Sequence, residues 1–137
     1  MKFFLQGDSG VLPTLEQWRA AAEPKPAGVM VPNDVDIEEL QADLPRLSTI
    51  ALQFPKWTDG RAYSQAVLLR GRLRYTGEIR ATGEVLADML PLLQRCGFDA
   101  VQLRADQKLE TAQRALGYFG NHYQTVPSER QAKELRP

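Results

Sequence analysis

The sequence has very little of the side-chain chemistry that most cofactor sites need. Its 137 residues include one cysteine, Cys96, and one histidine, His122. One thiol cannot form an intrachain disulfide, and a single Cys with a single His cannot complete a structural zinc site or a four-thiolate iron–sulfur site. No Walker, GxGxxG or GxSxG sequence occurs either. We therefore expect no metal and no cofactor, and the sequence identifies no catalytic residue.

An excess of charge of one sign and long apolar runs are missing as well. Lys+Arg and Asp+Glu are both 17, so the formal net charge is zero. A duplex-DNA binder or a polybasic membrane protein depends on clustered cations. No apolar run approaches the roughly 20 residues that span a bilayer, and the start MKFFLQGDSG lacks the pattern of a signal peptide. We expect a cytoplasmic protein without a nucleic-acid or membrane partner.

Short apolar segments alternate with helical patterns along most of the chain. Their centres are roughly one β-plus-α unit apart, and the segments are residues 28–32, 48–54, 78–82 and 99–104. Nearly continuous apolar runs are typical of parallel strands. The sequence therefore predicts an α/β fold with a parallel β/α domain at residues 28–125, either an open sheet or a partial barrel-like array. The last three segments are expected to be mutually parallel neighbours.

The two ends of the chain differ from this pattern. Residues 1–27 combine an apolar start, a GDSG turn, a short helical stretch and a Pro-bearing linker. They are interpreted as an N-terminal appendage whose first residues can form an edge strand. Residues 126–137 are polar and are interpreted as a C-terminal tail.

Each connection between the predicted strands has residues that suit the start or the end of a helix. Candidate N-caps, in chain order, are Asp34 or Asp36, Thr58 or Asp59, Thr82, and Asp106. The third connection is expected to carry a stripe of Val85, Met89, Leu92 and Cys96, a bend at Pro91 and a C-terminal stop at Gly97.

Ligand sites of parallel β/α folds lie at the carboxyl ends of the strands. Three predicted strand ends each supply an arginine, namely Arg61, Arg80 and Arg104. The residues placed to orient or complete their site are Asp59, Glu84, Asp106, Tyr63 and Ser64. Guanidinium groups beside helix N-termini suit a small oxyanion or a carboxylate. The alternative is that the acidic residues and Thr82 cap helices while the arginines bridge to them.

Cys96 is the one candidate redox residue. A free cysteine usually packs as a small hydrophobe, and a helix C-terminus raises the thiol pKa, which disfavours the reactive thiolate. We therefore expect Cys96 to be structural. Trp18, Trp57 and Tyr63 are interpreted as packing anchors, with Trp57 next to the predicted ligand face.

Three ordered blocks resemble the bacterial domain-of-unknown-function family DUF934. They are FPKWTDGRAYSQAVLLR at 54–70, GEIRATGEVLAD at 77–88 and RCGFD at 95–99. The resemblance covers about residues 28–125. Two positions depart from it: Glu84 stands where the family often has Asp, and Met89 where Gln is common. A polar contact made by Gln at position 89 would be missing here.

Members of this family are usually encoded beside the siroheme sulfite reductase of sulfate assimilation, and some are labelled probable oxidoreductases. The resemblance implies an accessory part in sulfite reduction, with the reductase or its electron-transfer partner as binding partner. With one cysteine, this chain alone cannot hold the reductase's cluster. A small enzyme or binding domain for a carboxylate or phosphate, and a pure protein–protein module, remain the alternatives. We also expect a homodimer, because a second copy would cover an edge or face of a small sheet.

Overall fold

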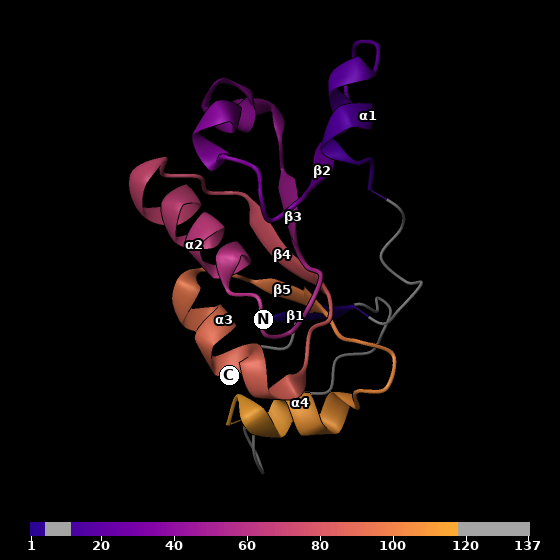
Figure 1. The fold of residues 1–137 in the computed structure, drawn as a ribbon, viewed down its shortest axis with the longest axis vertical. Helices are drawn as coiled ribbons and strands as arrows, with labels where there is room; N and C mark the ends of the chain where they lie inside the picture. The colour runs from indigo at the N-terminus through magenta and orange to yellow at the C-terminus, as the bar shows by residue number, and fades with distance from the viewer. Residues whose placement is uncertain (5–11, 118–137) are drawn as a thin grey trace.

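The computed structural model describes residues 1–4 and 12–117, which form an α/β domain around one parallel sheet (Figure 1). The sheet has five strands in the order β1-β5-β4-β3-β2. Their bounds are β1 Lys2–Phe4, β2 Gly28–Val31, β3 Thr49–Phe54, β4 Glu78–Gly83 and β5 Ala100–Gln102. Every neighbouring pair is parallel. The predicted fold class is confirmed, as is the parallel pairing of β3, β4 and β5.

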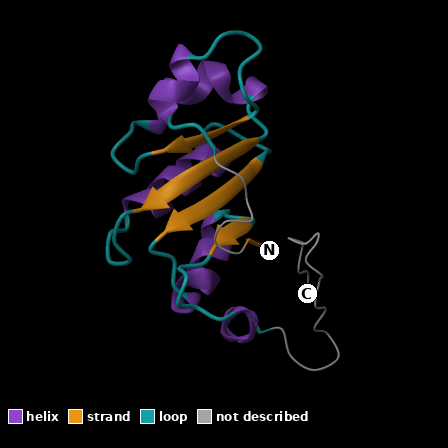
Figure 2. Ribbon diagram, turned by 90° about the vertical axis from the view of Figure 1, so that its right-hand side faces the viewer, coloured by secondary structure: helices purple, strands orange, loops and turns teal. Residues whose placement is uncertain are grey.

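The helices lie in the connections between the strands. Three connections hold η1 (a 3₁₀ helix, Ile37–Arg46), α2 (Arg61–Val67) continued by the π-helical η2 (Leu68–Arg72), and the 3₁₀ turn η3 (Ala87–Met89) leading into α3 (Leu90–Cys96). Strands β2 to β5 follow one another in space as in sequence. Crossovers of one hand therefore return the connecting helices to the same face, and Figure 2 shows them behind the sheet. α1 (Leu15–Ala20) precedes β2, and α4 (Leu109–Ala115) follows β5.

The hydrophobic core lies between the sheet and these helices. Successive side chains of a strand point to opposite faces, so every second residue enters the core. Ile50, Leu52 and Phe54 of β3 are fully buried, as are Ile79 and Ala81 of β4. The intervening residues of the same strands include Gln53, Arg80 and Thr82, which puts polar groups on the opposite face.

Two helix boundaries agree with the sequence. The Asp36 side chain caps η1 by accepting a hydrogen bond from the backbone N–H of Glu38 at 3.0 Å. Gly97 ends α3 with a φ of 108°, a conformation that glycine adopts without the steric cost of a Cβ. Asp59 accepts a bond from the backbone N–H of Arg61, the first residue of α2, although Gly60 occupies the cap position.

Apart from the stop at Gly97, the predictions for the third connection are wrong. Thr82 does not cap a helix, because β4 continues through it to Gly83. Pro91 does not bend α3, because it lies in the first turn, where the missing N–H costs nothing. With α3 starting at Leu90, Leu90 and Leu93 face the core while Leu92 is exposed, so the predicted apolar stripe does not form.

Asp106 is not a helix cap either. α4 begins three residues later, at Leu109, and its N-cap position is Lys108. Both carboxylate oxygens of Asp106 accept hydrogen bonds from Arg104 instead.

The described part of the N-terminal segment, expected to be an appendage, contributes to the sheet and the core. β1 pairs with β5 at the sheet edge, as predicted for an edge strand. Trp18 of α1 is 1% exposed, and its indole N–H donates to the carbonyl of Pro26 at 2.7 Å. The predicted C-terminal tail at 126–137 and His122 lie outside the described residues. Across residues 1–4 and 12–117, no helix is long and apolar enough to cross a membrane.

Candidate functional site

The loops after β3, β4 and β5 bring polar residues to the carboxyl edge of the sheet. Each loop leads into a helical segment: the loop after β3 leads to Arg61, the first residue of α2, and the loop after β5 carries Arg104. β3 and β5 are separated by β4, so their ends are roughly 10 Å apart. The edge therefore holds two ionic clusters.

Asp59 is the centre of the first cluster. It accepts hydrogen bonds from the Arg61 side chain, from Nε at 3.2 Å and from Nη2 at 3.0 Å, and from Nδ2 of Asn33 at 2.9 Å. These donors hold the pKa of the Asp59 carboxyl well below its usual range. The Asn33 bond also ties the end of β2 to the start of α2.

Arg104 is the centre of the second cluster. Its guanidinium donates to both oxygens of Asp106 at 2.7 Å and to Oε1 of Glu84 at 3.0 Å. The bonds from Arg104 lower the pKa of Asp106 to about 2, and both carboxylates raise the pKa of Arg104. With two carboxylates to one guanidinium, the cluster carries a formal charge of −1. It borders a pocket of about 270 Å³ that Gly83, Gln102 and Leu103 also line.

Arg80 lies elsewhere, which corrects its predicted position at a strand end. It is the third residue of β4, opposite Ala51 and Ala100, and roughly 10 Å before the strand ends. It is 8% exposed, and its Nη2 and Nε lie 2.8 Å and 3.0 Å from Oε2 of Glu78. Its guanidinium carbon lies 4.0 Å from the centre of the Phe4 ring. The structure therefore brings Arg61 and Arg104 to one edge and leaves Arg80 in an ion pair on the sheet face.

The remaining predicted site residues lie on or near α2. Tyr63 packs edge-on against Phe54, with ring centres 5.1 Å apart, and burial, then Cys96, raises the pKa of its phenol. Ser64 is exposed in the first turn of the helix. Cys96 is half-buried against the core, and that burial raises the pKa of its thiol, the direction that disfavours a thiolate.

The two tryptophans differ in their environment. Trp18 is a packing anchor, as predicted, whereas the side chain of Trp57 is 54% exposed in the loop after β3. Trp57 stands three residues after Phe54, whose side chain is fully buried, and two before Asp59. The sequence marked Trp57 as adjacent to the site, but its exposure depends on the loop conformation and has no sequence signal.

Sequence reasoning also missed Gln65. This buried side chain on α2 donates from Nε2 to the carbonyls of Pro32 at 2.9 Å and Val35 at 3.1 Å. The amide thereby fixes the loop after β2, which carries Asn33, against α2. Only its position on the core-facing side of a helix pattern could have suggested this contact.

Acidic residues are present at the carboxyl edge, but they are engaged by arginine. Within residues 1–4 and 12–117, no group of three or more His, Cys, Asp or Glu residues is placed to hold a metal ion.

One comparison with known proteins gives a match. A family model described as a bacterial protein of unknown function, DUF934, matches residues 28–133. No curated protein and no solved structure matches the chain.

Proposed function

Because the chain belongs to the DUF934 family, whose model spans residues 28–133, we propose that it is a docking accessory protein of assimilatory sulfite reduction. The partner is the siroheme sulfite reductase or the protein that supplies its electrons. The genetic association that the family resemblance implies supports the pathway. The geometry of the carboxyl edge supports docking as the mode of action.

The observation that carries the docking proposal is the exposure of Trp57. Large aromatic side chains are usually buried, and tryptophan is among the residues that contribute most to protein interfaces. Trp57 lies between Lys56 and Thr58, both exposed, in the loop after β3. The Asp59–Arg61 cluster begins two residues further along the chain. An aromatic anchor beside charged groups matches the apolar centre and polar rim of a protein interface.

The charges at the same edge favour docking over binding of a small oxyanion. Asp59 already neutralises Arg61, and Glu84 and Asp106 outnumber Arg104. A sulfite or sulfate ion would have to displace a two-point carboxylate contact and approach a cluster of net negative charge. A protein surface can instead contact the carboxylates and guanidinium groups together.

Two further expectations, on the compartment and on the oligomeric state, belong to the same proposal. The protein acts in the cytoplasm, where the reductase that the family accompanies is found. A homodimer fits a sheet whose polar face carries half-buried residues such as Met30 and Gln102. Light scattering at micromolar concentration tests the dimer, and a monomer alone would refute it.

The docking proposal is tested by binding of the purified chain to purified sulfite reductase of the same organism. We expect Trp57→Ala to weaken binding roughly 30-fold, the effect of losing a central aromatic contact. Val67→Ala is the matched control, because Val67 is as exposed but lies at the far end of α2. Equal affinity of the two variants, or no binding by the unmodified chain, contradicts the proposal.

Thermal melts with sulfite, sulfate and phosphate separate the alternatives. Docking predicts no stabilisation by millimolar anion. A stabilisation that Arg61→Ala or Arg104→Ala removes would favour a ligand-binding domain or small enzyme at the carboxyl edge.

A further inference from the structure

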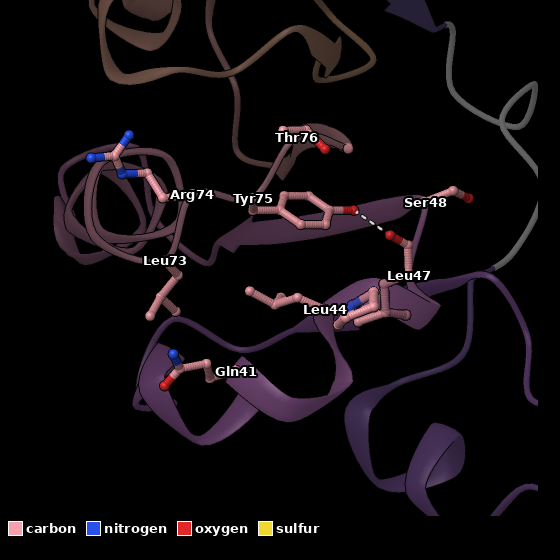
Figure 3. Close-up of a pocket in the computed structure, with 10 residues that line it drawn as sticks. Gln41, Leu44, Leu47, Ser48, Leu73, Arg74, Tyr75 and Thr76 are labelled. Carbon is pink, nitrogen blue, oxygen red and sulfur yellow. Dashed lines mark hydrogen bonds between the residues drawn. The ribbon is translucent and has the colours of Figure 1, made fainter.

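A larger pocket lies at the opposite, amino-terminal edge of the sheet (Figure 3). It has a volume of about 570 Å³ and is bordered by the end of η1 and by the loop that leads from η2 into β4. This volume falls within the range of small-molecule sites in proteins. The pocket shares no residue with the carboxyl-edge clusters.

Half of the ten residues that line this amino-edge pocket are apolar or aromatic, and the other half supply polar side chains or backbone. Leu44 and Leu47 come from the η1 side, and Leu73 and Tyr75 from the loop before β4. Figure 3 shows the Leu44 and Leu73 side chains in the space beside the Tyr75 ring. The hydroxyl of Tyr75 donates to the carbonyl of Leu47 at 3.0 Å and so joins the two walls. An apolar ligand body would replace water against these side chains.

The pocket has one charged residue among its ten lining residues, and that residue is a cation. Arg74 lies at the rim, and its guanidinium forms no ion pair with any residue that the structure describes. Figure 3 shows the guanidinium directed away from Leu44, towards the outside of the pocket. Rotamer changes of such exposed side chains are common on binding. The flexible stem thus allows the guanidinium to meet an anionic group at the rim.

The loop that carries Arg74 is held firmly in an unusual conformation. Arg74 has a φ of 58°, in the left-handed region that residues other than glycine, Asn and Asp rarely adopt. Nη1 of Arg70 donates to the carbonyls of Tyr75 at 2.9 Å and Gly77 at 2.7 Å on either side of Thr76. Residues in this conformation persist where the surroundings fix them, and they concentrate at functional sites.

We propose that the amino-edge pocket binds a small amphipathic carboxylate. The apolar body lies against Leu44, Leu73 and Tyr75, and the carboxylate is bound by Arg74. A guanidinium presents paired donors that match the two oxygens of a carboxylate. The absence of acidic residues from the lining removes the competition that Arg61 and Arg104 face at the other edge. This site does not depend on the docking proposal.

The test uses 4-phenylbutyrate as the probe, with NMR spectra of the full chain labelled with ¹⁵N. We expect saturable shifts of the backbone amides at 41–44, 46–48 and 73–77. The neutral 4-phenylbutyramide and acetate are expected to bind at least about tenfold more weakly, because each lacks one half of the recognised chemistry.

Arg74→Gly is the decisive variant, because glycine accepts the left-handed conformation and the loop should keep its fold. It is expected to weaken 4-phenylbutyrate binding at least tenfold. Arg114→Ala, which removes an exposed arginine of α4, is expected to leave the affinity unchanged. Equal binding of 4-phenylbutyrate to the unmodified chain and to Arg74→Gly overturns the proposal. So does equal binding of the amide, or shifts confined to other residues.

Discussion

Replacing Arg80 by alanine tests whether this arginine is part of the scaffold rather than of an exposed anion site. Arg80 and Glu78 face the same side of β4, with side chains only 10% and 14% exposed. Both Nε and Nη2 of Arg80 contact Oε2 of Glu78, while Nζ of Lys2 lies 3.1 Å from Oε1. The substitution removes two of the three donors to a nearly buried carboxylate.

The magnitude follows from which partners remain. Removing one member of a buried ion pair costs about 3–5 kcal/mol, because the other charge is left unpaired. Lys2 still neutralises part of the Glu78 charge, which reduces that cost. Loss of the guanidinium over the Phe4 ring adds about 0.5–2 kcal/mol. We therefore expect Arg80→Ala to lower the free energy of unfolding by about 2–4 kcal/mol.

Urea unfolding of Arg80→Ala, Glu78→Gln and the double variant measures this cost and the coupling between the two side chains. The double variant should lose less stability than the two single variants together, by about 1–3 kcal/mol. A loss below about 0.5 kcal/mol in Arg80→Ala, with no coupling, would show that the pair behaves as an exposed one. The reasoning from burial would then be refuted.

Three further predictions concern the core and its edges. Burial raises the pKa of Tyr75 to about 12 from 10.0, so the folded state favours the neutral phenol. The contribution of this neutral phenol to the free energy of unfolding is complete below pH 10 and is lost as pH rises towards 12. Urea titrations should show this loss, up to about 2–3 kcal/mol, and a Tyr75→Phe variant that loses stability just as steeply would contradict it. Gly97→Ala should lower the free energy of unfolding by about 1–3 kcal/mol, because φ is 108° and the new Cβ would lie 2.5 Å from Cγ of Arg70. Gly71→Ala is the control, because a Cβ there meets open space, and equal melting temperatures of the two variants would contradict this prediction. Trp18→Ala should cost about 3–5 kcal/mol by calorimetry, since the side chain is 1% exposed, whereas an effect near zero would mean that α1 does not contribute to core stability.

The strands could be predicted closely from the sequence. Residues 48–54 and 78–82 correspond to β3 and β4 within one residue, because short apolar runs between turn signals allow few alternatives. The parallel pairing follows from the length of the connections, which each hold a helix. The edge strand β1 was anticipated from the apolar start of the chain.

Helix starts could not be predicted as well, because capping residues also serve other contacts. Thr82 remains in β4, where its hydroxyl donates to the carbonyl of Leu52 at 3.3 Å. Asp106 pairs with Arg104 two residues away. A local sequence pattern does not distinguish a cap from a neighbouring ion pair.

The candidate site was predicted in part. Arg61 and Arg104 do lie at the carboxyl edge, and the carboxylates named to orient them do bind them. Arg80 was misplaced: it is the third residue of the predicted segment 78–82 and of β4 alike, so its side chain lies on the sheet face and not at the carboxyl edge. The exposure of Trp57 and the amino-edge pocket depend on how distant loops meet, which residue spacing alone does not determine.

Growth on defined sulfur sources tests the proposed function most directly. A strain that lacks this protein is complemented with the unmodified gene, with Trp57→Ala or with Val67→Ala, and is grown on sulfate or on cysteine. The account predicts slow growth on sulfate alone, restored by the unmodified chain and by Val67→Ala but not by Trp57→Ala. Normal growth of the deletion strain on sulfate, in a genome with no second copy, would contradict a role in sulfite reduction.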